Sequence, residues 1–267
     1  MRPRGSFAHR GTVAVVALLA AAVVQPRLDA RQPRAAKPKS AELLARFFAP
    51  DTKPLMQYRA LRTLNATSRG GKMHASMTAW TSYDAEHGFQ FEVVSEEGSS
   101  LIRRKVLLAA LEAERDAVTT GQRDEAALTV ANYEFLDMST TPANLVKVDV
   151  KPKRKAVMLV DGSLFLEADS ADLVKIEGEL ARRPSFWTRN VKVLREYARV
   201  SGVHVPVAMS STADVLFAGP SSFSMTYKYV EINGTSVEPK DFPTLEFPAD
   251  PFTHPVTQPT IWGPVAH

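Results

Sequence analysis

The sequence predicts an α+β fold in which about nine or ten strands form one curved, mostly antiparallel sheet. Two observations predict it. Between residues 72 and 234, short segments with apolar side chains at alternate positions follow one another through short links, as antiparallel strands do. Helical spacing of apolar residues is confined to the residues before 72 and to one insertion at 101–117. A doubly wound α/β fold, in which strands and helices alternate, does not fit this order.

The first 30 residues predict a secretory signal peptide. Three arginines precede an apolar run at 12–24, and Pro26 interrupts the run before Ala30, where a small residue suits signal peptidase. We expect cleavage after Ala30, although cleavage after Ala22 or retention as an anchor also fits the pattern. The apolar run is short for a membrane span. We therefore expect an exported protein located in a bacterial periplasm.

Charge and cysteine content exclude several classes of protein. The chain has no cysteine, which excludes a lipidated lipoprotein, a disulfide scaffold, a thiol enzyme and a cysteine-ligated zinc protein. Without the expected signal peptide, 29 basic residues stand against 28 acidic ones, and four of the basic ones lie in a leader at 31–39 that we expect to be disordered. Because basic and acidic residues are nearly equal in number, we expect no basic surface stripe that would bind nucleic acid. The basic leader allows at most a transient contact with an anionic membrane.

Two helical segments are expected at the start of the folded part. The first follows Ser40, a plausible N-cap, and ends before Pro50. Its apolar residues at helical spacing are Leu43, Leu44, Phe47 and Phe48. A second helix is expected over 55–65, because its apolar residues also fit the helical period and the glycines after Arg69 would end it. Both helices would pack on the sheet.

A hairpin and a longer helix follow. Apolar side chains alternate over 73–80, and after a turn at 84–88 the segment 89–93 returns as the second arm. The helix at 101–117 has two apolar faces, one of Ile102 and alanines and one of leucines. Either the leucines face the core and the alanine side meets solvent, or the helix is a lid between two apolar compartments. Residues 119–130 predict a polar connection.

Strands resume at Tyr133 and continue to a turn at Asn233-Gly234. The sharpest local signal is Asp161-Gly162, which predicts a type I′ hairpin between 157–160 and 163–166 because this dipeptide accepts positive φ. Further strands are expected over 133–138, 145–150, 174–180, 186–200, 203–207, 213–217 and 223–229. Seven prolines after Asn233 keep the tail at 236–267 out of a sheet, so we expect it to be extended.

The longest expected strand, 186–200, carries the adjacent rings Phe186 and Trp187. Adjacent side chains of a strand point to opposite faces, so either both rings pack into apolar cores or one of them faces a ligand cavity. A curved sheet roofed by a helix would then hold an apolar groove on its second face. The candidate groove residues are Trp80, Leu107, Leu108, Leu111, Met158, Val160, Phe165, Trp187 and Leu194.

The sequence offers no catalytic or metal-binding constellation. It contains no GxSxG, HExxH or GxGxxG motif, and the glycines after Arg69 lack the spacing of a phosphate loop. Its histidines are scattered without partners at ligand spacing. Paired carboxylates such as Glu112 and Glu114 are expected to be solvated. We therefore predict a protein that is not an enzyme and that needs no cofactor and no metal.

Several segments resemble the periplasmic lipoprotein-carrier-like (LolA-like) superfamily. They are residues 158–165, 177–180, 184–187, 195–199 and 225–229. The resemblance spans about 40–235 and is one of pattern, so no binding residue is carried over individually. It implies an unclosed β half-barrel that is covered by helices, has a hydrophobic interior and performs no covalent chemistry. Such carriers accept acyl chains or hydrophobic partners.

Three functions remain open at this point, in order of preference. The first is a periplasmic carrier or binding protein for a lipid, an acyl chain or another hydrophobic ligand, for example in outer-membrane lipoprotein sorting. The second is a cell-envelope interaction module that docks an acylated or other protein partner through an exposed apolar edge or its Pro-rich tail. The third is a hydrolase whose site the sequence does not disclose.

Overall fold

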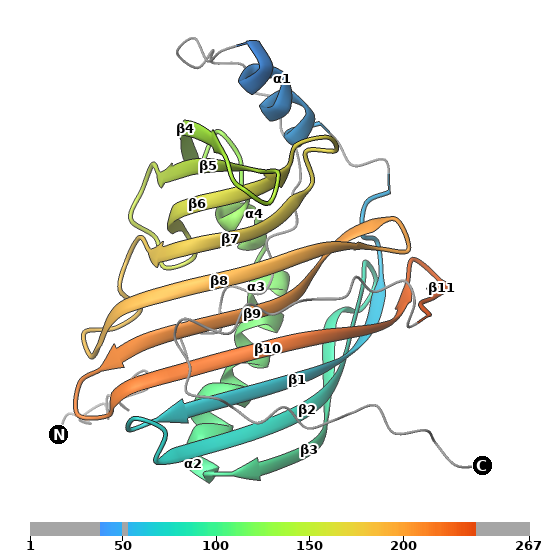
Figure 1. The fold of residues 1–267 in the computed structure, drawn as a ribbon. Helices are drawn as coiled ribbons and strands as arrows, with labels where there is room; N and C mark the ends of the chain where they lie inside the picture. Colours follow the sequence, from blue (N-terminus) through green and yellow to red (C-terminus); the bar gives the residue numbers. More distant parts are fainter. Residues whose placement is uncertain (1–37, 50–52, 239–267) are drawn as a thin grey trace, which may run out of the picture.

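The computed structural model describes residues 38–49 and 53–238, apart from the side chains of Pro38, Lys39, Arg123 and Asp124 (Figure 1). The expected signal peptide at 1–30, most of the expected leader at 31–39 and the tail from residue 239 onward lie outside the described residues.

The described strands belong to a single antiparallel sheet. They are β1 (Tyr58–Ser68), β2 (Met73–Asp84), β3 (Gly88–Gly98), β4 (Tyr133–Thr140), β5 (Leu145–Pro152), β6 (Val160–Glu167), β7 (Leu173–Leu180), β8 (Thr188–Val200), β9 (Val203–Val215), β10 (Gly219–Ile232) and β11 (Thr235–Ser236). The strand order is β3-β2-β1-β10-β9-β8-β7-β6-β5-β4, and β11 pairs with β10. The sheet is therefore open, with β3 and β4 as its edges, which confirms the predicted α+β class and the antiparallel, unclosed sheet.

Helices cover only part of the sheet, less than predicted. They are α1 (Pro38–Phe47), α2 (Ser100–Ile102), η2 (Arg103–Leu108), α3 (Ala109–Thr119) and α4 (Arg123–Ala126), where η2 is a π-helical segment. The segments α2, η2 and α3 run on from one another as one long helix that crosses the curved sheet behind β1, β9 and β10, and α1 lies at the far end by β4 to β7 (Figure 1). None of the described helices is both long and apolar enough to span a membrane.

Strand register shows which side chains share the face under the helices, called the inner face below. One row of paired residues crosses the sheet from β2 to β4, with one residue from each strand. In strand order its members are Met77, Leu64, Met225, Met209, Arg195, Ile176, Leu164, Val148 and Met138. Because paired residues of antiparallel strands point to the same face, this row lies on the inner face throughout.

The inner face carries two apolar cores. The first lies under the long helix and contains Leu64, Met77, Leu107, Leu111 and Met225 among others. The second lies under α1 and contains Leu43, Phe47, Leu164, Leu166 and Ile176 among others. On β8, Arg195 lies between Val193 of the first core and Tyr197 of the second, and Val200 further along belongs to the first core again.

The predicted helix at 55–65 is wrong, because these residues form most of β1. Inward-facing residues of β1 are Tyr58, Ala60, Arg62, Leu64 and Ala66, all of them buried. Two small alanines and a buried arginine occupy alternate positions, so hydrophobicity does not reveal the two-residue period. Pairing with β2 and β10 on both sides overrides the local helical spacing.

The predicted hairpin turn at Asp161-Gly162 is also wrong, because both residues lie inside β6. Gly162 pairs with Gly178 of β7. A Cβ atom added to Gly162 would lie 2.6 Å from the Gly178 Cα and 2.1 Å from the Glu177 carbonyl oxygen. Gly162 therefore serves the close approach of two strands and not a positive φ.

The long strand predicted at 186–200 begins later than expected, at Thr188. Phe186 and Trp187 precede it in a loop and are 77% and 45% exposed, so they do not stand on opposite faces of a strand. The segments 203–207 and 213–217, predicted as two strands, are the two ends of β9. Pro206 is accommodated because the register between β8 and β9 shifts next to it, between Glu196 and Tyr197.

Candidate ligand-binding site

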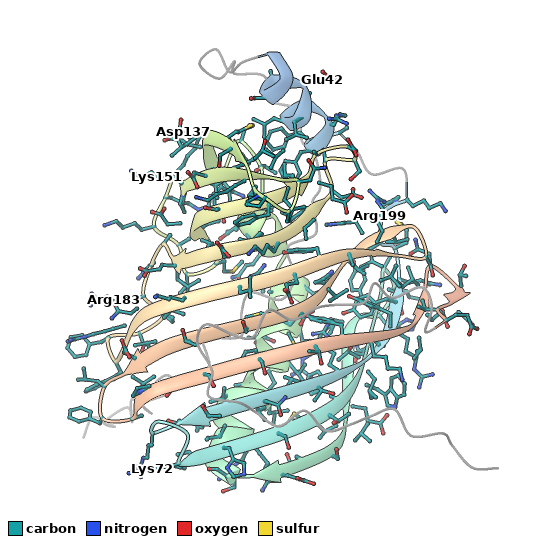
Figure 2. The ribbon with its side chains drawn as sticks, viewed as in Figure 1. Glu42, Lys72, Asp137, Lys151, Arg183 and Arg199 are labelled. Carbon is teal, nitrogen blue, oxygen red and sulfur yellow. The ribbon has the colours of Figure 1, made fainter. Side chains whose placement is uncertain are left out.

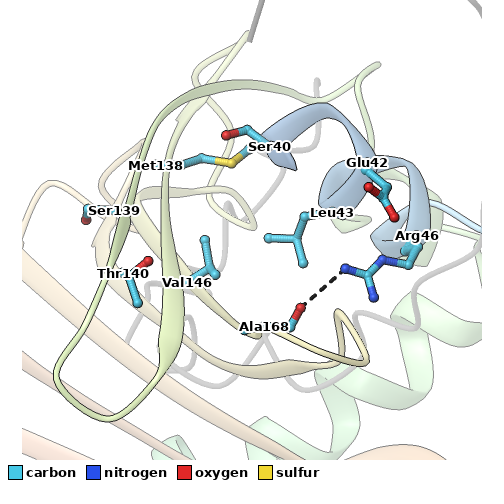
Figure 3. Close-up of a pocket in the computed structure, with 9 residues that line it drawn as sticks. All are labelled: Ser40, Glu42, Leu43, Arg46, Met138, Ser139, Thr140, Val146 and Ala168. Atoms are coloured by element: carbon cyan, nitrogen blue, oxygen red, sulfur yellow. Dashed lines mark hydrogen bonds between the residues drawn. The ribbon is translucent and has the colours of Figure 1, made fainter. Parts of the chain in front are cut away.

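A pocket of about 410 Å³ lies between α1 and the β4 edge of the sheet (Figure 3). It is lined by Ser40, Glu42, Leu43, Arg46, Met138, Ser139, Thr140, Val146 and Ala168. Leu43 and Val146 face each other across its centre, and the hydroxyl, carboxylate and guanidinium groups lie around them (Figure 3). An apolar middle with a few polar groups is typical of a small-molecule site.

Packing holds α1 over this pocket. Leu43, Leu44 and Phe47 are buried in the second core. The Phe48 and Phe135 rings meet edge to face with centroids 4.9 Å apart. A helix of ten residues is marginal in water by itself, so these contacts decide whether α1 stays in place.

Arg46 fixes the end of α1 to the β6–β7 turn. Its guanidinium donates to the carbonyl oxygens of Asp169 and Ala168, the latter at 3.3 Å from Nη2. A cation in the last turn of a helix also interacts favourably with the helix dipole. One side of the pocket is thus closed by an exposed polar contact that water can replace.

A buried ion pair joins the long helix to the sheet in the first core. Arg62 on β1 donates from Nη1 to Glu114 Oε2 at 2.5 Å and from Nη2 to Glu114 Oε1 at 3.0 Å. Arg62 Nη2 also donates to the Tyr58 hydroxyl at 2.7 Å. Burial by itself would lower the pKa of Arg62, but the adjacent Glu114 carboxylate holds that pKa well above its ordinary value. Glu114 is therefore not solvated as predicted.

Four further polar atoms on the inner face, from three residues, are buried without a hydrogen-bond partner. They are the guanidinium nitrogens Nε and Nη2 of Arg195, the Ser211 hydroxyl and the Tyr227 hydroxyl. Arg195 is 5% exposed, and no ion pair involves it among the described residues. Burial raises the pKa of Tyr227 well above its ordinary value, so the hydroxyl keeps its proton. Sequence reasoning missed these residues, although Arg195 has the spacing that places it on the face of Val193 and Tyr197.

Five of the nine candidate groove residues take part in the two cores. Leu107, Leu108 and Leu111 on the long helix and Met158 belong to the first core or pack against it, and Val160 belongs to the second. The leucines of the predicted two-faced helix therefore face the core, but its alanine side does not meet solvent as expected, because Ile102, Ala110 and Ala117 are buried as well.

The other four candidate groove residues lie elsewhere. Trp80 is on the outer face, where the Arg59 guanidinium covers its ring at 4.7 Å. Phe165 is also on the outer face, with Lys175 Nζ 4.3 Å from its ring centroid. Leu194 neighbours Arg195 along β8 and therefore points outward. Trp187 lies in the loop before β8.

Trp187 belongs to an exposed aromatic cluster with Phe186 and Phe217. Its ring centroid lies 5.3 Å from that of Phe186 and 5.7 Å from that of Phe217, which is 89% exposed. The cluster joins the loop before β8 to the turn between β9 and β10, so it lies at the opposite end of β8 from Arg199. Figure 2 labels Arg183, in the loop before β8, and Arg199 at these two ends. Three exposed rings in contact form an apolar surface that a folded chain rarely leaves to water without a use.

Metal-binding geometry is not found in the part of the chain that the structure describes. No three His, Cys, Asp or Glu side chains there converge as a metal site requires. His204 Nε2 donates a hydrogen bond to the Leu173 carbonyl oxygen, 2.7 Å away, and the ring stacks on Tyr197, so the ring has a structural role.

Comparison with known proteins gives similar solved structures only. No protein-family model and no curated protein matches the chain. A DUF1329 family protein from Desulfovibrio piger is 11% identical, with coverage of 72% of this chain and 92% of that chain and a TM-score of 0.37. A putative outer membrane lipoprotein-sorting protein domain from Vibrio parahaemolyticus is 11% identical, with coverage of 76% and 94% and a TM-score of 0.35. A LolA superfamily protein from Nitrosomonas europaea is 12% identical, with coverage of 76% and 96% and a TM-score of 0.34. The superfamily that the sequence resembles is thus represented among these structures.

Proposed function

We propose that the protein binds and carries an apolar or amphiphilic ligand, such as a lipid or an acyl chain, between the inner face of its sheet and α1. The observation that carries this proposal is the pocket of about 410 Å³ under α1, whose volume falls within the range of small-molecule sites. Leu43, Met138 and Val146 supply its apolar surface. Outer-membrane lipoprotein sorting is one process that uses such a carrier.

Binding would be driven by the burial of hydrocarbon. Each methylene group removed from water contributes about 0.8 kcal/mol, so ten of them contribute about 8 kcal/mol before the costs of ordering are subtracted. No charged contact is needed to hold such a chain. Release would follow when α1 leaves the sheet, since α1 forms one wall of the pocket.

The proposal is tested by filling the pocket. Binding of the fluorescent probe N-phenyl-1-naphthylamine, and its displacement by oleate, would be measured for the wild type and for Val146→Trp. We expect saturable binding by the wild type and at least a tenfold loss in the variant, because the indole would occupy the space of the ligand. The matched control is Lys147→Trp, on the same strand but facing outward beside Phe165. Absence of probe binding, or equal binding by all three proteins, would contradict the proposal.

The proposed location is the periplasm, reached with the signal peptide at 1–30. Terminal sequencing of the protein from its native host should give Arg31 as the first residue. A chain that still begins at Met1 would contradict export with cleavage. We further propose that the function involves no covalent chemistry, which a turnover activity found in a broad hydrolase screen would overturn.

A second candidate function, docking to an envelope protein, is favoured by the exposed cluster of Phe186, Trp187 and Phe217. Aromatic side chains are enriched at protein interfaces. A photoreactive residue placed at position 217 would crosslink to the partner in the native cell, whereas one at exposed Val94 on β3 would not. Crosslinking at neither position would argue against docking through this cluster.

A further inference from the structure

The inner face carries a charged residue, Arg195, between a residue of the first apolar core and a residue of the second. In the row of paired residues that runs from Met77 on β2 to Met138 on β4, Arg195 is flanked by Met209 on β9 and by Ile176 on β7. Every other member of that row is apolar. A guanidinium in such surroundings is costly unless an anion accompanies it.

One hydroxyl group without a partner lies on the neighbouring strand β9. Ser211 on β9 pairs with Val193, two residues before Arg195, and so stands diagonally across from Arg195 on the inner face. The other, Tyr227, lies on β10, two strands from β8, and four residues from Phe223, the partner of Ser211. It therefore stands on the other side of the Arg195 row, about 13 Å along the strand from Ser211.

These groups share one chemical property, which is that each can donate a hydrogen bond. The Arg195 atoms Nε and Nη2 together form a side of the guanidinium that can bind two oxygens of one ligand group. Ser211 adds a hydroxyl donor. A carboxylate or a phosphate group at Arg195 would supply the missing counter-charge and accept from Ser211, whereas an uncharged alcohol would leave the guanidinium without its counter-charge.

We propose that Arg195 and Ser211 form an interior site for the anionic group, a carboxylate or a phosphate, of the amphiphile that the protein carries. This inference rests on the proposed carrier function and narrows it to ligands that combine a hydrocarbon chain with one anionic group.

The same row of residues gives the direction of the hydrocarbon chain. From Arg195 it passes Ile176, Leu164 and Val148 to Met138, which lines the pocket under α1. Ile176, Leu164 and Val148 are buried in the second core together with residues of α1, so a chain laid over these four strand spacings, about 19 Å in all, would take the place of α1. The anionic group would lie at Arg195 and the end of the chain at the pocket.

The test compares ligands that differ only in charge. Binding of oleate, oleyl alcohol and inorganic phosphate would be measured by native mass spectrometry and calorimetry for the wild type, Arg195→Met, and the control Arg189→Met, an exposed arginine of the same strand. We expect the wild type and the control to bind oleate at least tenfold more tightly than oleyl alcohol, and Arg195→Met to bind both equally. Ser211→Ala should weaken oleate binding by about tenfold and leave oleyl alcohol unaffected, whereas Tyr227→Phe should leave the binding of both unchanged.

Thermal unfolding gives a readout that does not depend on ligand purity. Without ligand, Arg195→Met should unfold at a higher temperature than the wild type, because the variant removes a buried charge that has no counter-charge. Oleate should then raise the unfolding temperature of the wild type and not that of Arg195→Met.

Each contrary result has a separate meaning. Equal binding of oleate and oleyl alcohol by the wild type, or a lower unfolding temperature of ligand-free Arg195→Met, would overturn the anion site and leave the carrier function in place. If neither amphiphile binds but phosphate binds in an Arg195-dependent manner, the anion site stands and the carrier function falls. If none of the three ligands binds, both are wrong.

Discussion

Arg62 and Glu114 form a bidentate ion pair inside the protein, and this pair is a direct polar link between the long helix and the sheet. Both side chains are almost fully buried, at 1% and 3% exposure. The Tyr227 ring lies 4.5 Å and the Phe89 ring 5.0 Å from the guanidinium carbon, so aromatic faces complete its surroundings. The position of the long helix over β1 is therefore set by charge as well as by apolar packing.

Removing one partner of this pair should destabilise the protein strongly. Glu114→Leu leaves the Arg62 charge buried without compensation, which costs about 3–5 kcal/mol of the free energy of unfolding. Urea unfolding followed by circular dichroism measures this loss. Replacing both partners, as Arg62→Met with Glu114→Leu, should recover most of it.

The control for this experiment is Glu112→Leu, an exposed glutamate on the same helix, which should change the free energy of unfolding by no more than about 0.5 kcal/mol. A Glu114→Leu variant as stable as this control would show that the ion pair does not hold the helix.

Gly162 on β6 and Gly178 on β7 let the two strands approach so closely that no space remains for a side chain at Gly162 or Gly178. We expect Gly162→Ala to lower the free energy of unfolding by about 3 kcal/mol, because its Cβ would lie 2.1 Å from the Glu177 carbonyl oxygen and the strands would have to separate. Chemical denaturation measures the effect. Glu179→Ala, an exposed change next to Gly178, is the control, and equal stability of the two variants would refute the close contact.

Acid should weaken the link between β7 and the end of β8. Burial alone would raise the pKa of Asp172, but hydrogen bonds from Arg199 Nε and Nη2, both 2.6 Å long, hold that pKa below its ordinary value. A carboxylate whose pKa is lower in the folded state contributes stability above its unfolded pKa of about 3.9, and this contribution is lost as the pH falls through the folded pKa.

The corresponding measurement is the thermal midpoint of unfolding between pH 7 and pH 2. The midpoint of Asp172→Asn should fall less steeply than that of the wild type below about pH 4. Asp137→Asn, which removes an exposed carboxylate from β4, serves as the control. Identical acid profiles for Asp172→Asn and the wild type would show that the Arg199 contact contributes nothing.

Opening of α1 should be sensitive to Phe47. This ring is buried in the second core, and Phe47→Ala should lower the free energy that keeps α1 in place by about 3 kcal/mol. The amide hydrogens of α1 would then exchange about 100-fold faster, while those of β9 would be much less affected. Glu42→Ala on the exposed side of α1 is the control. Unchanged exchange in Phe47→Ala would mean that α1 is held by other contacts.

Local patterns predicted most of the fold. The hairpin of β2 and β3, the long helix and the segments of β4, β5 and β7 could be identified because their apolar side chains follow a two-residue or helical period. The strand β1 could not be identified in this way, because Arg62 occupies a central inward position at which the two-residue pattern requires an apolar residue. The Asp161-Gly162 pair predicts a turn, because the sequence does not show whether a glycine is required for a positive φ or for the close approach of two strands.

The candidate site was less accessible to sequence reasoning than the fold. Deciding which residues share a face requires the register between strands, and without it Trp80, Phe165 and Leu194 were grouped with inward-facing residues. The pocket combines α1 with β4 and β5, which are far apart in the chain, so no local motif marks it. Arg195 could have been found, because it alternates with Val193 and Tyr197 on a strand whose other inward residues are apolar.

The central claim is that the protein carries an amphiphile, and the material bound to the protein in its native host tests that claim most directly. Protein purified without detergent would be weighed by native mass spectrometry, and organic extraction would follow to identify what it holds. We predict an approximately equimolar amphiphile with a hydrocarbon chain and one carboxylate or phosphate group. Protein that is recovered empty and that takes up no added oleate would contradict the account.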